Sequence, residues 1–218
     1  MDALALNEDE GCFGMVFGRA GRGKSRTAQW YSGHNDCVYL KILKIWKYSE
    51  LDFLKNLCLA AGIIQPPKRK GAAFAAIVDK MIDKPRPVFI DEIEKMLADF
   101  IDIIRDLAEA TGLPFILMGE EELVSYMQRD RRVWSRTFQQ LEYKPIEIAD
   151  ILLYTQESIG QKMSIDIASL LHRSSGGDWR PVKRAVIGMA HYLNSNPDKK
   201  MTIEAAKLII DSGLTGKK

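Results

Sequence analysis

A glycine-rich stretch with one lysine and one serine, GRAGRGKS at residues 18–25, has the residue types needed to bind phosphate. Its spacing is G-x-x-x-x-G-K-[ST], in which glycine backbones turn their N–H groups toward phosphate oxygens. Lys24 can reach the β- and γ-phosphates, and the Ser25 hydroxyl can bind Mg²⁺. The remaining loop contacts are expected from Gly18, Arg19, Ala20, Gly21, Arg22, Gly23 and Arg26. The pattern predicts a site for a nucleoside triphosphate and magnesium, and a chance glycine-rich turn before a helix is the alternative.

A pair of carboxylates follows an apolar run, VFIDE at residues 88–92. If the run is a strand, both acids lie at the carboxyl edge of the sheet, where open α/β folds bind ligands. Asp91 suits the magnesium shell and Glu92 suits the polarisation of an attacking water. A helix-capping acidic pair is the alternative.

Two arginines have positions from which they could act on a triphosphate. Arg136 precedes the last expected strand and could reach the γ-phosphate held by a neighbouring subunit. Arg180 follows Asp178, a plausible N-cap, and would face the nucleotide from a helix start. Three other arginines compete with Arg136 for its role: Arg129, Arg131 and Arg132. Solvated surface arginines are the alternative for each.

The elements that must hold these residues alternate along the chain. Short apolar strands are expected at residues 12–17, 37–42, 88–90, 114–118 and 141–143, with helices between them. The alternation predicts an α/β fold with a parallel sheet flanked by helices on both faces. From Ile146 only helical patterns occur. We therefore expect two domains: residues 1–144 for nucleotide binding and residues 145–218 as a small all-helical lid.

Two basic clusters could contact nucleic acid. The first contains Lys44 and Lys47, beside Trp46 and Tyr48. The second is Lys68, Arg69 and Lys70. Lysine and arginine on phosphates give salt-dependent, sequence-tolerant affinity for duplex DNA. A solvated face is the alternative for both clusters, because the net charge of +2 does not by itself imply nucleic-acid binding.

Composition restricts the class of protein. The chain is 46% hydrophobic and 28% charged, as expected of a soluble globular protein. It contains no apolar run of about 18 residues, so no membrane span is expected. Its three cysteines are odd in number and lie in apolar surroundings, which favours buried thiols in a reducing cytoplasm.

Taken together, the phosphate loop, the Asp-Glu strand, Arg136 and Arg180 resemble the AAA+ ATPases, a P-loop NTPase family. The narrower resemblance is to target-selecting transposition ATPases of the phage Mu B type. It is carried by CFGMVFGRAGRGKS, VFIDEIEKM, LPFILMGEEEL, WSRTFQQLEYKPIEIADI and SSGGDWRPVKRAV. It implies that Arg136 is an arginine finger and Arg180 a sensor-2 arginine. Glu120 stands where a small polar sensor 1 is usual, and few residues precede the first strand, so no N-terminal DNA-binding extension is expected.

The resemblance implies an ATPase that assembles as a homo-oligomer or helical filament on non-specific duplex DNA and recruits or activates a transposase. A helicase loader or replication initiator with the same fold is a rival. A nucleotide-gated binding module with little turnover is another. The sequence leaves open ATP against GTP, the DNA preference, the number of subunits per turn, the choice among the four arginines, and whether a phage, prophage or transposon encodes the chain.

Overall fold

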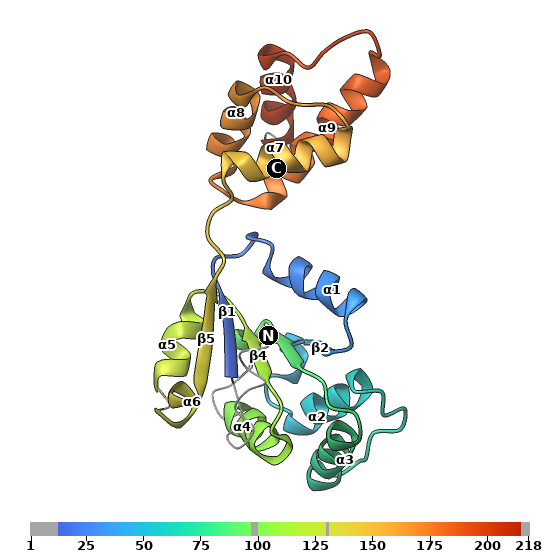
Figure 1. The fold of residues 1–218 in the computed structure, drawn as a ribbon, viewed down its shortest axis with the longest axis vertical. Coiled ribbons are helices and arrows are strands. Elements are labelled where there is room, and N and C mark those ends of the chain that lie inside the picture. Colours follow the sequence, from blue (N-terminus) through green and yellow to red (C-terminus); the bar gives the residue numbers. More distant parts are fainter. Residues whose placement is uncertain (1–12, 97–99, 130, 215–218) are drawn as a thin grey trace. The chain divides into compact units, whose positions relative to one another are not determined.

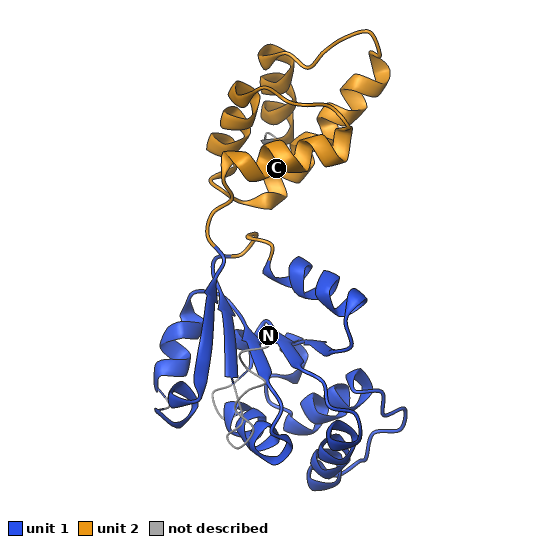
Figure 2. Cartoon of the chain, in the orientation of Figure 1, with its two compact units in different colours: residues 1–19, 24–143 blue, residues 20–23, 144–218 orange. Residues whose placement is uncertain are grey.

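The computed structural model describes residues 13–96, 100–129 and 131–214. The chain divides into two compact units (Figure 2). One comprises residues 1–19 and 24–143, and the other comprises residues 20–23 and 144–218. Each unit has its own hydrophobic core.

The first unit is built on a parallel sheet of five strands (Figure 1). The strands are β1 (Phe13–Phe17), β2 (Val38–Lys41), β3 (Val88–Asp91), β4 (Phe115–Met118) and β5 (Thr137–Glu142). Their order is β2-β3-β4-β1-β5, and every neighbouring pair is parallel. All carboxyl ends therefore meet at one edge of the sheet. The predicted parallel sheet flanked by helices is confirmed.

Helices cover both faces of this sheet. They are α1 (Lys24–His34), α2 (Glu50–Ala60), α3 (Lys70–Asp83), α4 (Phe100–Thr111), α5 (Glu122–Arg129) and α6 (Arg131–Ser135), with short 3-10 helices η1 (Lys44–Trp46) and η2 (Ile93–Lys95). Successive strand side chains point to opposite faces. Phe89 and Ile116 therefore pack with Ala28 of α1, whereas Ile90 and Leu117 belong to the larger core shared with α2, α3 and α4.

Two predicted boundaries were wrong. The polar and glycine-containing stretch SGHND at residues 32–36 predicts a turn after Tyr31, but the helix after the phosphate loop continues through Gly33 to His34. The last strand begins at Thr137, four residues before the expected Leu141. Its polar residues TFQQ gave no strand pattern, but pairing with β1 decides the conformation, starting with the Phe13 N–H donating to the Arg136 carbonyl at 2.9 Å. Residues 1–9, whose sequence is compatible with a short helix or a loose segment, and Cys12 lie outside the described residues.

The second unit contains four helices within its described residues: α7 (Ile148–Ile159), α8 (Ile165–Ser175), α9 (Trp179–Ser195) and α10 (Ile203–Leu214). Their apolar faces form one core that includes Ile151, Leu171 and Met189. The predicted N-cap is confirmed, because the Asp178 carboxylate accepts a hydrogen bond from the Arg180 N–H at 2.7 Å. Among the described helices, none combines the length and apolar character needed to cross a membrane.

Candidate functional site

The phosphate loop lies between β1 and α1, as its sequence requires. Helix α1 begins at Lys24, so its amino-terminal end and its positive dipole face the loop. Lys24 is buried, and its ammonium donates to the carbonyl of Gly18 at 2.5 Å and to that of Arg19 at 3.1 Å. Gly18 has φ +140°, and a Cβ there would lie 2.6 Å from the Tyr143 carbonyl oxygen. The loop is therefore closed on the lysine that is expected to meet phosphate.

The tip of the loop, residues 20–23, packs on the turn between α8 and α9 within the second unit. The Trp179 N–H donates to the Gly21 carbonyl at 3.0 Å. A Cβ on Gly21 would lie 2.2 Å from the Asp178 carboxylate. The Arg22 guanidinium is buried beside Gly177, where a Cβ would lie 2.3 Å from its Nη1. Small residues at both places permit this contact.

Asp91, at the carboxyl end of β3, is almost fully buried, with 1% of its surface exposed. Its Oδ2 accepts a hydrogen bond of 2.7 Å from the Tyr39 hydroxyl on β2. Burial raises the pKa of Tyr39, and the hydrogen bond to the Asp91 carboxylate raises it further, so the phenol keeps its proton and donates it. Asp91 therefore lies at the carboxyl edge of the sheet, where the sequence predicts a magnesium ligand.

Glu92 follows in a left-handed conformation, with φ 60° and ψ 41°. It is the single non-glycine residue with positive φ in the part of the chain that the structure describes. Its carboxylate forms ion pairs with Lys41 at 3.2 Å, from the end of β2, and with Lys95 of η2. Partial burial raises the pKa of Glu92, but these two lysines outweigh it and hold the pKa below its ordinary value. Glu92, the expected general base, is therefore ionised and paired with the ammonium groups of two lysines.

Two further carboxylates lie near this edge. Glu94 is placed so that a Cβ on Gly119, after β4, would lie 2.6 Å from its Oε2. Glu94 is exposed, but partial loss of solvent around its carboxyl raises its pKa, and the charges of Glu120, Glu92 and Asp91 raise it further. Glu120, which the sequence resemblance aligns with sensor 1, is therefore close enough to Glu94 for its negative charge to act on that carboxyl. No group of three metal-ligating side chains forms among the described residues, so a magnesium ion here would rely on phosphate and water for its other ligands.

Arg136 lies at the opposite end of the sheet, because it directly precedes β5 in a parallel arrangement. Its guanidinium pairs with Glu109 of α4 at 3.2 Å and donates to the Arg132 carbonyl at 3.2 Å. The competing arginines Arg129, Arg131 and Arg132 are exposed. Arg132 also lies 3.8 Å from Asp102. Arg180, in the second unit, is exposed at the first turn of α9.

The two basic clusters predicted from sequence are linked through α2. Lys44 and Lys47 lie in the loop that precedes α2. Lys70 begins α3 and forms an ion pair of 2.5 Å with Glu50, the first residue of α2. Lys68 and Arg69 are exposed just before it. Trp46, in contrast, is buried in the core and does not face solvent.

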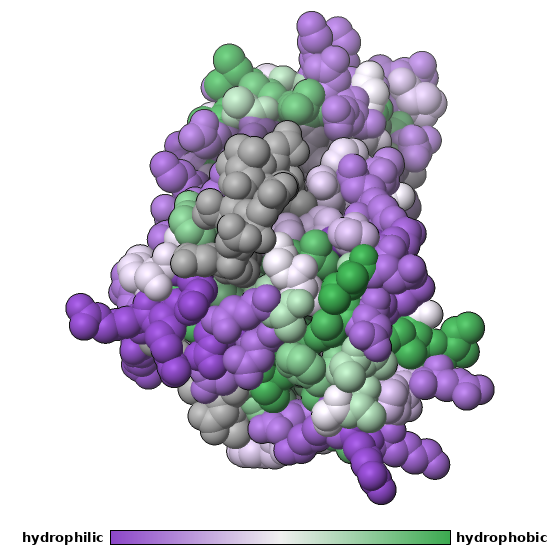
Figure 3. Space-filling model, turned by 60° about the horizontal axis from the view of Figure 1, so that its bottom comes forward, coloured by the Kyte–Doolittle hydropathy of each residue, from purple (hydrophilic) through white to green (hydrophobic). Residues whose placement is uncertain are grey.

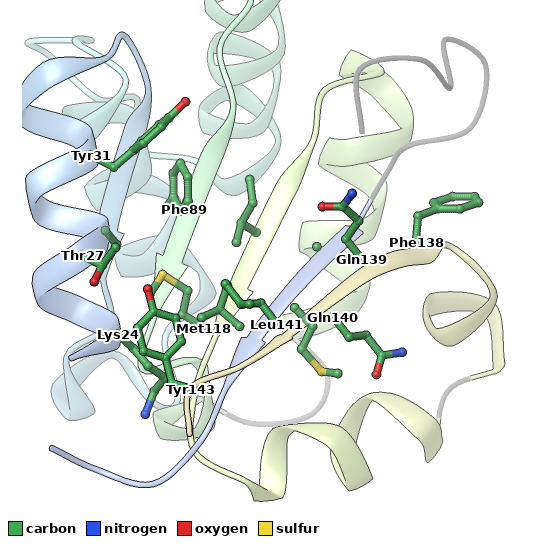
Figure 4. A pocket seen from close by; sticks show the side chains of 15 residues that line it. Lys24, Thr27, Tyr31, Phe89, Met118, Phe138, Gln139, Gln140, Leu141 and Tyr143 are labelled. Atoms are coloured by element: carbon green, nitrogen blue, oxygen red, sulfur yellow. The ribbon is translucent and has the colours of Figure 1, made fainter. Parts of the chain in front are cut away.

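A cavity of about 550 Å³ lies on the α1 face of the sheet, and Lys24 is part of its wall. Thr27 and Tyr31 line it from α1, Phe89 and Met118 line it from the sheet, and residues 138–141 line it from β5 (Figure 4). Its lining is mostly apolar. The cavity belongs to the sheet face, whereas Asp91 and Glu92 lie at the sheet edge.

Comparison with known proteins agrees with this geometry. Residues 8–127 match a protein family described as "AAA domain". The chain belongs to this AAA family. The match includes the phosphate loop, Asp91 and Glu92, and it ends before Arg136 and the helical unit.

Two phage-type relatives are similar to this AAA protein. The "Mu-like prophage FluMu DNA transposition protein B" of Haemophilus influenzae is 23% identical over 146 residues, which is 64% of this chain and 51% of that protein. The "ATP-dependent target DNA activator B" of Escherichia phage Mu is 29% identical over 118 residues, 54% of this chain and 38% of that protein. The chain thus spans about half the length of these relatives or less. Both support the resemblance to the Mu B type.

Two solved structures of archaeal proteins have a similar fold. The Aeropyrum pernix ORC2 protein, in an ADPNP-ADP complex, has a TM-score of 0.71 at 13% identity, covering 97% of this chain and 66% of that one. The Pyrobaculum aerophilum Cdc6p has a TM-score of 0.64 at 14% identity, covering 90% of this chain and 60% of that one. At such identities the likeness concerns the fold alone.

Sequence reasoning missed three side chains that hold the acids of this AAA protein: Tyr39, Lys41 and Lys95. A signal for two of them was present. Tyr39 and Lys41 are two residues apart on β2, so their side chains lie on the same face of the sheet. The strand register pairs Lys41 with Asp91. The order of the strands was not derivable from the alternating pattern, so the neighbour of β3 could not be named in advance.

Proposed function

We propose that this protein binds ATP with magnesium and hydrolyses it to ADP and phosphate. Lys24 would bind the β- and γ-phosphates, Ser25 and Asp91 would hold Mg²⁺, and Glu92 would polarise the attacking water. The supporting observation is that the phosphate loop follows β1 and the acids end β3, two strands of one parallel sheet. The other loop residues, from Gly18 to Arg26, would contact phosphate and ribose.

A phosphate-release assay tests this role of Glu92. Glu92→Gln keeps the size of the side chain but cannot accept the proton, so we expect turnover to fall at least about a hundredfold while nucleotide binding remains. Glu121→Gln, a change at an exposed residue of the same acidic stretch, is the matched control. Equal turnover in wild type and Glu92→Gln would show that Glu92 is not the base.

We further propose that Arg136 acts on a nucleotide held by a second copy of the chain. It precedes a strand of six residues, so roughly 20 Å of sheet separates it from the carboxyl edge of its own unit. A guanidinium cannot span that distance, which favours action between subunits. Arg132, whose carbonyl accepts a hydrogen bond from Arg136, lies beside it, and Arg129 and Arg131 are the further candidates for this role.

Mixing two inactive variants tests this directly. In a mixture of Arg136→Ala and Glu92→Gln, the first supplies an intact base and the second an intact arginine. We expect activity to return in the mixture and not in either variant alone. If activity does not return, the mixture is repeated with an alanine variant of each of the three other arginines. Recovery with one of them identifies the residue that acts between subunits, and recovery with none contradicts the proposal. Arg180→Ala, in a separate measurement, tests the proposed sensor-2 role.

The names of the relatives favour DNA as the platform for assembly and a transposase as the partner. We propose that the protein assembles on duplex DNA when ATP is bound and delivers that DNA to a transposase. Sedimentation and microscopy with duplex DNA, comparing no nucleotide, ADP and a non-hydrolysable ATP analogue, test assembly. A molecule that stays monomeric with DNA and the analogue contradicts the proposal.

A second candidate is a replication initiator or helicase loader, which would have the same fold. Pull-down from the native host separates the two, because a transposase or a replicative helicase should be recovered. The third possibility, a nucleotide-gated binding module, predicts negligible phosphate release both with and without duplex DNA.

A further inference from the structure

The loop between β2 and α2 exposes large apolar side chains. Ile45 is 82% exposed and Tyr48 is 78% exposed. Lys44 and Lys47 alternate with them, and residues 41–49 contain no carboxylate. Hydrophobic side chains also reach the surface between hydrophilic ones on the face shown in Figure 3, so exposure alone does not distinguish this loop. Its distinguishing property is the regular order of cation and apolar group.

The backbone of this loop fixes that order in space. Residues Lys44–Trp46 form the 3-10 helix η1, and Lys47 continues the turn with φ −48° and ψ −31°. Hydrogen bonds from the Trp46 N–H to the Leu43 carbonyl and from the Lys47 N–H to the Lys44 carbonyl, at 3.0 and 3.2 Å, close it. In such a turn, side chains three residues apart lie above one another. The loop therefore has a cationic stripe, Lys44 and Lys47, beside an apolar stripe, Ile45 and Tyr48.

Trp46 anchors this turn in the core, so that the two stripes face solvent. It is 9% exposed and packs in the core of the first unit, together with the fully buried Ile42. The Ser49 N–H donates to the Trp46 carbonyl at 2.9 Å, and Ser49 then caps α2. With both ends of the turn anchored, Ile45 cannot rotate into the core. Its exposure is therefore a consequence of the fold.

The charges indicate which partner this is. A cationic stripe matches one phosphate backbone, and the adjacent apolar stripe then faces the groove beside that backbone. The minor groove of B-DNA is about 6 Å wide, admits single apolar side chains, and carries little sequence information. We propose that Ile45 and Tyr48 enter the minor groove of duplex DNA while Lys44 and Lys47 bind the phosphates of one strand. This inference rests on the proposed function, because it specifies how the bound duplex is held.

Salt dependence of binding separates the two stripes. Fluorescence anisotropy with a short labelled duplex and a non-hydrolysable ATP analogue is measured from about 50 to about 200 mM salt. Lys44→Gln and Lys47→Gln should each reduce the slope of log affinity against log salt by about one. Ile45→Ser and Tyr48→Ser should each weaken binding about tenfold and leave the slope unchanged, because their contacts release no counterion. Ile82→Ser, at a residue 60% exposed on α3, is the matched control and should have no effect.

A second readout reports the groove itself. A duplex with 2-aminopurine should brighten on binding wild type, as an inserted side chain loosens base stacking, and should not brighten with Ile45→Ser. A minor-groove-binding polyamide should compete with wild type for the duplex. The inference is overturned if Ile45→Ser and Tyr48→Ser bind as tightly as wild type, if the polyamide does not compete, or if these variants lose self-assembly without DNA. Failure of wild type to bind duplex in any nucleotide state overturns the proposed function instead.

Discussion

Removal of one hydroxyl, in Tyr39→Phe, should cost this protein a measurable part of its stability. Asp91 is 1% exposed, and its carboxylate accepts a hydrogen bond of 2.7 Å from the Tyr39 hydroxyl. Loss of a hydrogen bond to a buried charged acceptor costs about 2 kcal/mol. For a chain of this length, each 1 kcal/mol lowers the melting temperature by about 2–4 °C, so Tyr39→Phe should melt about 4–8 °C below wild type.

Magnesium should reverse most of that loss. If Asp91 lies in the metal shell, Mg²⁺-ATP gives its carboxylate a cation in place of the phenol, and the difference in melting temperature should shrink. Tyr31→Phe is the matched control, because Tyr31 packs on Phe89 with ring centroids 5.5 Å apart and its hydroxyl has no partner among the described residues. Thermal unfolding followed by fluorescence gives the melting temperature of each variant with and without Mg²⁺-ATP. A Tyr39→Phe protein that melts within about 1 °C of wild type refutes the reasoning.

Three other changes follow from the same geometry. Lys41→Met should raise phosphate release without DNA about two- to fivefold by weakening the hold on Glu92, because a partly exposed ion pair contributes at most about 1 kcal/mol; Lys80→Met, at the pair with Asp83, should leave it unchanged. Glu94→Gln should melt higher than wild type at neutral pH without nucleotide. Because the pKa of Glu94 is raised in the folded protein, its carboxyl stabilises the fold fully below the ordinary value of 4.5, and this contribution is lost as the pH rises. The difference in melting temperature between the variant and wild type should therefore vanish in acid. Gly18→Ala should cost about 2 kcal/mol at φ +140°, whereas Gly33→Ala, in open space on α1, should not destabilise.

Much of the fold was predictable because its signals are local. Apolar runs bounded by turns gave the first four strands, and the glycine spacing placed the start of α1 at Lys24. The N-caps Ser49 and Asp178 followed from a short polar side chain ahead of a helical pattern. The beginning of β5 did not, because TFQQ carries no apolar alternation and becomes a strand only through its pairing with β1.

The candidate site was predictable where it depends on residue type and hidden where it depends on register. Asp91 and Glu92 could be chosen because acids after an apolar strand reach the sheet edge. Lys41 and Tyr39 could not be assigned to them without knowing that β2 lies beside β3. Trp46 stands between the two lysines of the first basic cluster, but a helical turn with three residues per repeat directs it to the core.

The contact between the loop tip and the turn after α8 also constrains how the sequence can change over time. Gly21 lies against Asp178, and Arg22 lies against Gly177. These partners are far apart in the sequence: Arg22 and Gly176, which share a hydrogen bond, are 154 positions apart. A methyl group at position 21 or 177 requires a compensating loss of atoms on the other side. The two short stretches should therefore vary together among descendants of this gene, and a chimera that exchanges only one of them should fold less well than a chimera that exchanges both.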